Sequence, residues 1–226
     1  MLIETDTILG SNPQPSAYLE AYRVLRSSLM AMKDENTFGS VLITSPGEKE
    51  GKTTVSINLA TALALVHRST ILVDADFYGT GLEAALSLAE DTPGLTDVCA
   101  GQAELDGVLL QTELEQLRVL PAGTDVARGP DLALTDAMRD TIEQLKQRAE
   151  YVLIDCTPVE GFSTAISLAH SVDMVLLVTL ARSRVVPVRR VIEELREVGA
   201  TVGGVVVNDI LHADSTVYQA YHRYYQ

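Results

Sequence analysis

Short, almost wholly apolar runs alternate with stretches of helical periodicity along the sequence, and this alternation most restricts the possible folds. The apolar runs lie at residues 41–44, 71–73, 117–120, 151–154, 174–178 and 202–207. A strand that is apolar on both faces must be covered on both sides, as in a parallel sheet between layers of helices. The pattern therefore predicts an α/β fold with an open, mainly parallel sheet flanked by helices.

Helices are predicted where apolar residues recur at helical spacing, at residues 17–33, 53–67, 131–148 and 187–198. A cluster of Gly, Ser, Asn and Pro before the first helix predicts a linker over residues 1–15. We expect one domain over residues 16–210, followed by a tyrosine-rich tail at residues 211–226 that has little periodicity.

The composition excludes several classes of protein. With 46% apolar and 21% charged residues, the sequence is not that of a wholly disordered chain. Its net charge of −14 disfavours non-specific binding to nucleic acid or anionic lipid. Two cysteines do not make a disulfide framework, and no apolar run reaches the roughly 18 residues that a membrane helix needs. We therefore expect a cytoplasmic protein.

Residues 41–54 have the pattern of a strand, a loop and a helix start, with Gly51, Lys52 and Thr53 at the junction. A helix start offers backbone N–H groups and the positive end of the helix dipole to a phosphate. In such a loop the lysine reaches the β- and γ-phosphates and the threonine hydroxyl binds Mg²⁺. The strict phosphate-loop pattern is not met, because Gly47 stands one place too late. The alternative is an ordinary helix start with a surface lysine.

Carboxylates follow two further apolar runs. Asp74 and Asp76 follow the run at residues 71–73, and Asp155 follows the run at residues 151–154. In open α/β sheets, ligands bind outside the carboxyl ends of the strands. A lysine, a hydroxyl and three carboxylates at one edge are the groups that magnesium-nucleotide chemistry needs. Taken singly, each aspartate has an alternative role as a simple turn residue.

Taken together and in this order, the motifs resemble those of the bacterial tyrosine kinases of capsular and exopolysaccharide synthesis. This family is a branch of the deviant Walker ATPases and is related to partition and division-site ATPases. The matching segments are Glu20–Arg26 (the family's E-x-x-R-x-x-R), the loop through Thr54 (Walker A), Asp74–Asp76 (A′), Ile154–Pro158 (Walker B), residues 93–98, 119–123 and 204–208, and the tyrosine-rich end. The resemblance covers nearly the whole chain. It implies a P-loop fold like that of the partition ATPases.

The resemblance also implies a role for each matching residue, with ATP and Mg²⁺ as cofactors. Lys52 would contact the phosphates, Thr53, Asp74 and Asp155 would hold Mg²⁺, and Asp74, with Asp76 beside it, would activate the attacking hydroxyl. The implied nucleotide-binding residues are Gly47, Lys49, Glu50, Gly51, Lys52, Thr53, Thr54 and Asn208, of which Asn208 would face the adenine.

The first predicted helix has an implied role in assembly. Glu20, Arg23 and Arg26 would join neighbouring copies into a ring, so that the tail of one copy reaches the site of the next. The alternative for these residues is ordinary (i, i+3) ion pairing on an exposed helix face.

Three positions depart from the family pattern. Lys49 replaces a glycine before the Walker lysine, Tyr78 stands where the family has an arginine, and Cys156 stands where it has a threonine. These departures leave the core ligands in place, but they leave open a weakly active or inactive nucleotide-gated assembly switch.

The resemblance implies an ATP-dependent protein-tyrosine autokinase that regulates polysaccharide polymerisation and export. Its acceptors would be Tyr218, Tyr221, Tyr224 and Tyr225, unless these tyrosines pack on a partner or lie disordered without being modified. The implied partners are further copies of the chain, a tyrosine phosphatase, and a membrane co-polymerase that activates the kinase at the inner face of the plasma membrane; nucleic acid is not expected. A partition- or division-type ATPase is a further alternative, although the acidic net charge disfavours DNA cargo.

Overall fold

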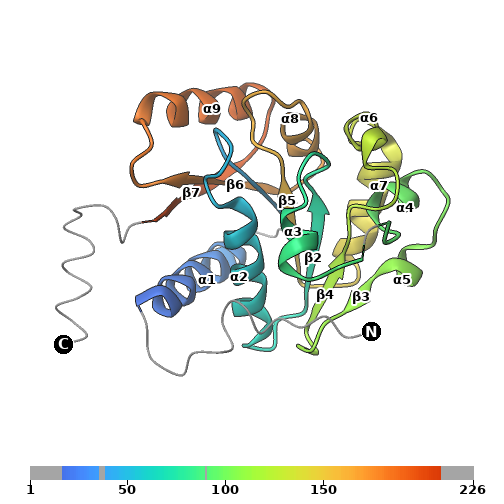
Figure 1. Cartoon of the computed structure of the whole chain (residues 1–226). Helices are drawn as coiled ribbons and strands as arrows, with labels where there is room; N and C mark the ends of the chain where they lie inside the picture. Colours follow the sequence, from blue (N-terminus) through green and yellow to red (C-terminus); the bar gives the residue numbers. More distant parts are fainter. Residues whose placement is uncertain (1–16, 36–38, 90, 210–226) are drawn as a thin grey trace.

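A computed structural model of the chain describes residues 17–35, 39–89 and 91–209, and its centre is a seven-stranded sheet (Figure 1). The strands are β1 (Ser40–Thr44), β2 (Thr70–Ala75), β3 (Leu110–Gln111), β4 (Leu117–Leu120), β5 (Tyr151–Cys156), β6 (Met174–Leu180) and β7 (Val202–Asn208). Their order across the sheet is β3-β4-β2-β5-β1-β6-β7. Neighbouring strands are parallel except for β3 and β4, which are antiparallel. The prediction of an open, mainly parallel α/β sheet is confirmed.

Helices cover both faces of the sheet, because parallel strands must be joined by crossovers (Figure 1). On one face lie α1 (Ala17–Glu35), α2 (Lys52–Ala64) and α3 (Gly81–Ala85). On the other lie α4 (Leu95–Cys99), α5 (Leu105–Val108), α6 (Gly129–Leu132), α7 (Asp136–Lys146), α8 (Thr164–Ala169) and α9 (Val185–Glu197). A short 3-10 helix, η2 (Val126–Arg128), precedes α6.

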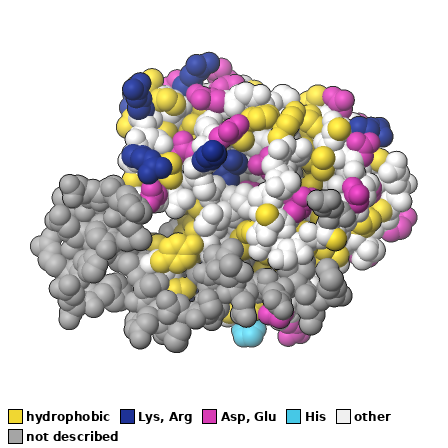
Figure 2. All heavy atoms as spheres, in the orientation of Figure 1, with side chains coloured by type: hydrophobic (Ala, Val, Ile, Leu, Met, Phe, Trp, Pro, Cys, Tyr) yellow, Lys and Arg dark blue, Asp and Glu magenta, His cyan; other side chains and the backbone are white. Residues whose placement is uncertain are grey.

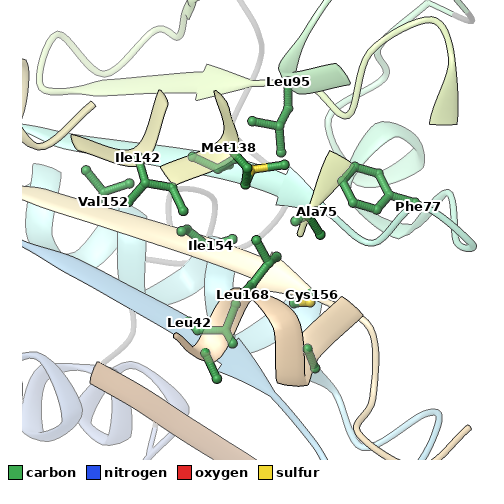
Figure 3. Close-up of a cluster of buried hydrophobic side chains, with 14 of the residues drawn as sticks. Leu42, Ala75, Phe77, Leu95, Met138, Ile142, Val152, Ile154, Cys156 and Leu168 are labelled. Atoms are coloured by element: carbon green, nitrogen blue, oxygen red, sulfur yellow. The ribbon is translucent and has the colours of Figure 1, made fainter. Parts of the chain in front are cut away.

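Successive residues of the central strands alternate between two cores, one on each face of the sheet. In β1, Leu42 belongs to the core under α7 and α8, whereas Val41 and Ile43 belong to the core under α1 and α2. Figure 3 shows the first core, where side chains from β1 and β5 meet those of α7 and α8. Both faces of these strands are therefore buried, which explains why their sequences are apolar throughout.

The helix α2 is buried on nearly all sides, because the sheet covers one side of it and α1 packs on another. Two polar contacts join the helices. The Asn58 amide donates to the Tyr18 hydroxyl at 2.9 Å, and the Arg26 guanidinium donates to the Ala62 carbonyl at 3.2 Å. The helix predicted over residues 17–33 is therefore an integral second layer on this face.

Several elements differ from the sequence prediction. The short helices α3, α4, α5 and α8 were not predicted. The helix predicted over residues 131–148 is divided into α6 and α7, because the backbone of Thr135 is extended and its hydroxyl accepts the Met138 N–H at 3.3 Å as an N-cap. The short strand β3 was not predicted, since two residues at the edge of a sheet carry no recognisable apolar pattern.

Charge is unevenly distributed over the surface. The chain has a net charge of −14, yet several basic side chains in Figure 2 lie where Figure 1 places α9, which carries exposed Arg189, Arg190 and Arg196. Among the described residues, no helix combines the length and apolarity needed to span a bilayer.

Asp173 joins the starting ends of β1 and β6 at the edge of the sheet away from the predicted site. Its carboxylate accepts the backbone N–H groups of Gly39 at 2.7 Å and Ser40 at 2.9 Å, the Ser40 hydroxyl at 3.0 Å and the Lys146 ammonium at 2.9 Å. Partial burial alone would raise the pKa of Asp173. The four donors outweigh burial and lower this pKa to about 2.

We expect Asp173→Asn to lower the free energy of unfolding by about 1–3 kcal/mol at pH 7, because the amide NH₂ cannot accept these donors. The pKa of Asp173 is depressed in the folded state, so its stabilising contribution is present above the ordinary value of about 4 and is lost as the pH falls toward about 2. Urea unfolding should therefore show the two proteins converging between pH 4 and pH 2. The exposed Asp140→Asn is the control, and equal loss in both variants would contradict this role.

Candidate active site

The loop between β1 and α2 is held in place by the far ends of two other strands. The Glu50 carboxylate accepts the Leu180 N–H at 2.5 Å and the Ser183 hydroxyl at 3.1 Å. The Asn208 amide donates to the Glu50 carbonyl at 3.1 Å. β6 and its following turn, together with the end of β7, therefore set the position of this loop.

Gly51 makes the junction between the loop and α2 possible. Its φ is 91°, in the left-handed region that favours glycine, and a Cβ at this position would collide with the Asn208 amide. As the N-cap residue of α2, Gly51 has no side chain to cap the first N–H groups of the helix. These N–H groups and the positive end of the α2 dipole form an anion-binding arrangement. Lys52 lies in the first turn with a buried side chain.

Asp74 and Asp155 are direct neighbours, because β2 and β5 are adjacent parallel strands and these two residues are paired in register. Both are buried. Burial, together with the negative charge of Asp155, raises the pKa of Asp74 well above its ordinary value. Burial also raises the pKa of Asp155 to about 6, although the hydroxyls of Thr53 and Ser56 and the charge of Lys52 lower it in part.

The donor set at this edge fits a magnesium ion. The Ser56 hydroxyl donates to Asp155 Oδ1 at 2.9 Å, while Asp155 Oδ2 is buried without a hydrogen-bond partner among the described residues. An unpartnered buried carboxylate oxygen is costly unless a cation satisfies it. The described residues contain no group of three His, Cys, Asp or Glu side chains that could hold a metal alone. Mg²⁺ usually takes one or two carboxylates from a protein and completes its shell with water and phosphate oxygens.

The structure brings most of the predicted site residues to one edge of the sheet. Lys52 and Thr53 begin α2, Asp74 and Asp155 end their strands, and Asp76 follows with its N–H donating to Asp74 Oδ1 at 3.0 Å. The other predicted nucleotide-binding residues here differ in exposure. Gly47 is half-buried, and Lys49 and Thr54 are exposed. The Glu50 side chain is buried and accepts the backbone N–H of Leu180 in β6.

Asn208 lies beside the loop, and both of its polar ends are engaged. The amide donates to the Glu50 carbonyl, and the Asn208 side-chain oxygen accepts the Asp209 N–H at 2.9 Å. Its contact with adenine stays a prediction.

Ser56 and Ser183 were not predicted from the sequence. Ser56 could have been found, because it follows Lys52 by one helical turn and so shares its face.

The remaining predicted residues lie elsewhere. Glu20 and Arg23 form an exposed (i, i+3) ion pair at 3.3 Å, the alternative that the sequence left open, and Arg26 binds α2. Their part in a ring is not tested by these contacts. The four tail tyrosines, Tyr218, Tyr221, Tyr224 and Tyr225, lie outside the described residues.

Comparison with known proteins agrees with this geometry. The AAA domain family matches residues 47–203 of the chain. Tyrosine-protein kinase CpsD of Streptococcus agalactiae serotype Ia is 30% identical over 199 residues, which are 87% of this chain and 84% of CpsD. Tyrosine-protein kinase ptk of Acinetobacter johnsonii is 26% identical over 204 residues, and the chain spans only 28% of its length. The kinase domain of Escherichia coli tyrosine kinase ETK superposes with a TM-score of 0.84 at 26% identity, covering 95% of this chain and 83% of that one.

The parallel sheet, the loop before α2 and the carboxylates at the strand ends define a P-loop nucleotide-binding fold. The match to CpsD covers most of both chains, and it shows to which family of P-loop proteins this chain belongs. The chain belongs to the bacterial tyrosine-protein kinases, within the AAA domain family.

We expect Asp155→Asn to raise the free energy of unfolding of the metal-free chain by roughly 1–3 kcal/mol at pH 7, because it removes a buried charge beside Asp74. The same change should abolish magnesium-dependent nucleotide binding. The pKa of Asp155 is higher in the folded than in the unfolded state, so the stability of the parent chain should fall as the pH rises from about 4 through about 6.

Urea unfolding in the presence of a chelator, at pH 5 and pH 8, measures both effects. The pH dependence should be weaker in Asp155→Asn, whereas the exposed Asp125→Asn should behave like the parent. A variant that unfolds more easily than the parent at pH 8 would show that the Asp155 carboxylate stabilises the fold.

Proposed function

We propose that the chain is an ATP-dependent protein-tyrosine kinase that phosphorylates the tyrosines of its own tail. The observation that carries the proposal is the pairing of Asp74 with Asp155 beside Lys52, with one Asp155 oxygen buried and unpartnered among the described residues. Phosphoryl transfer needs phosphate positioning, a cation site and a group that orients the nucleophile. The candidate site offers all three at one edge of the sheet.

Each residue would have a distinct task. The N–H groups of the loop, the start of α2 and the Lys52 ammonium would bind the phosphates of ATP. Thr53, Asp74 and Asp155 would hold Mg²⁺, which when bound neutralises charge on the β- and γ-phosphates. Asp74, with Asp76 beside it, would accept the proton of the attacking tyrosine hydroxyl.

The domain boundaries belong to the same proposal. We assign residues 16–210 to the kinase domain, residues 1–15 to a linker and residues 211–226 to a substrate tail. The tail would supply Tyr218, Tyr221, Tyr224 and Tyr225 to a neighbouring copy. Each phosphate would add a charge of about −1.5 to −2, so a modified tail on a chain of net charge −14 would weaken assembly by repulsion.

We further propose that the kinase regulates capsular or exopolysaccharide polymerisation and export. Its partners would be a membrane co-polymerase, which activates the kinase and brings it to the inner face of the plasma membrane, and a tyrosine phosphatase that resets the tail. The family and the match to CpsD support this assignment.

Mapping of phosphate by mass spectrometry after incubation with Mg-ATP tests the central proposal. The parent chain should carry phosphate on residues 218–225, and Lys52→Met should carry none. The lysine substitution should weaken ATP binding by about 10- to 150-fold, because it removes a charge-assisted contact worth about 1.5–3 kcal/mol.

Three outcomes would contradict parts of this proposal. Phosphate found only outside the tail would exclude the tail as substrate. Nucleotide-dependent assembly without any phosphotyrosine would favour an assembly switch over a kinase. Equal ATP affinity in Lys52→Met would contradict the phosphate-loop assignment.

For the ring, we expect the double variant Glu20→Ala and Arg23→Ala to reduce self-association and phosphorylation between copies. This ion pair is exposed, whereas Arg26 is needed to bind α2, so the double variant leaves the fold intact. Light scattering at concentrations where the parent assembles measures the effect. The double variant Asp136→Ala and Arg139→Ala removes a matched exposed (i, i+3) pair on α7 and is the control. Unchanged assembly in the α1 variant would refute the interface.

A further inference from the structure

An aromatic pair, with Tyr78 exposed and Phe162 half-buried, lies at the same edge of the sheet as the candidate carboxylates. The rings of Tyr78 and Phe162 are 4.6 Å apart between centroids and tilted by 49°. Tyr78 lies in the turn from Asp76 to Gly79, and Phe162 lies on the segment that follows β5 and Asp155. The side chain of Tyr78 is 59% exposed although it is large and largely apolar.

The turn that carries Tyr78 is fixed on both sides. The neighbouring Phe77 is buried in the core beside Ala75 (Figure 3), and Gly129 leaves the space that its ring fills. On the other side, Gly81 lies against the first turn of α2, since a Cβ there would be 3.1 Å from the Thr53 hydroxyl. The packing of Phe77 and Gly81 therefore holds Tyr78 next to Asp76, although the Tyr78 side chain itself is exposed.

The segment that carries Phe162 is attached to the same loop. The Val159 N–H donates to the Ser45 carbonyl at 2.8 Å, and the Glu160 N–H donates to the Pro46 carbonyl at 3.0 Å. The two members of the aromatic pair thus stand on segments that contact the phosphate-binding loop and the first turn of α2 that follows it.

We propose that Tyr78 and Phe162 form the acceptor subsite, against which the ring of the substrate tyrosine packs while its hydroxyl meets Asp74 and Asp76. This inference rests on the proposed kinase function and names the residues that select its acceptor. A phenol needs an apolar surface for its ring and a carboxylate for its hydroxyl. Here the backbone N–H of Tyr78 donates to Asp76 Oδ1 at 3.4 Å, so the aromatic pair begins beside a carboxylate.

The acceptor is best supplied as a separate peptide, so that its binding can be measured. The kinase is the full chain with Tyr218, Tyr221, Tyr224 and Tyr225 all changed to Phe, and the acceptor is a synthetic peptide of residues 211–226. Steady-state rates give KM for the peptide, KM for ATP and kcat for the parent, Tyr78→Ala, Tyr78→Phe, Phe162→Ala and the control Leu134→Ala. Leu134 is a comparably exposed apolar residue, with 71% exposure, and lies outside the site.

Tyr78→Ala and Phe162→Ala should each raise KM for the peptide by roughly three- to tenfold, the range expected for loss of an aromatic contact. KM for ATP should stay unchanged, as should ATP hydrolysis without the peptide. Tyr78→Phe should behave like the parent, because it keeps the ring and removes only the hydroxyl. This variant also distinguishes a binding surface from a phosphorylation site at Tyr78.

Several results would overturn the inference. An unchanged KM for the peptide in Tyr78→Ala, with transfer still abolished by Lys52→Met, would remove the subsite and leave the kinase function standing. An equal rise in KM for ATP would show that the pair shapes the nucleotide site. A parent chain that binds Mg-ATP but phosphorylates no tyrosine would overturn the kinase function and the subsite together. Thermal unfolding of each variant confirms that the comparison is made on folded protein.

Discussion

Asp74 and Asp155 lie opposite each other in register on β2 and β5, and the chemistry of the site depends on this pairing. Two buried carboxylates at this separation repel each other, and burial raises the pKa of both. The fold tolerates the cost because hydrogen bonding across the sheet and the apolar cores on its two faces hold β2 and β5 together. The pairing therefore lowers the free energy of unfolding of the metal-free chain, but it favours the binding of a divalent cation. Functional sites commonly reduce the stability of a protein in this way.

The phosphate loop depends on parts of the chain that are distant in sequence. Leu180, Ser183 and Asn208 come from the last third of the chain, and they hold Glu50 and so fix the loop between β1 and α2. Gly51 is required at the point where the loop passes Asn208. A loop anchored in this way keeps its N–H groups in place before the nucleotide arrives, which reduces the ordering cost of binding.

Much of the architecture could be predicted from local patterns. The six apolar runs all became strands. Five of these strands are largely buried on both faces, as the pattern predicted, whereas β7 at the edge of the sheet is only partly covered and exposes Val205 and Val207. The division of the helix predicted over residues 131–148 was missed, since Thr135 is compatible with either a helix interior or an N-cap. The site was predicted in part: Asp74, Asp155 and Lys52 follow from strand ends and a helix start. The engagement of Glu50 by β6 could not be predicted, because its partners are more than a hundred residues away.

The amino-acid sequence by itself determined the class of fold and the candidate site residues, because apolar periodicity and strand-end polar residues are local properties of the chain. The order of the strands, with β5 between β1 and β2, was decided only by the tertiary structure. That order places Asp155 beside Asp74, and the crossovers bring Tyr78 and Phe162 into contact. These contacts arise from the packing of helices against a twisted sheet, which depends on all strands at once and so leaves no signature at any single position.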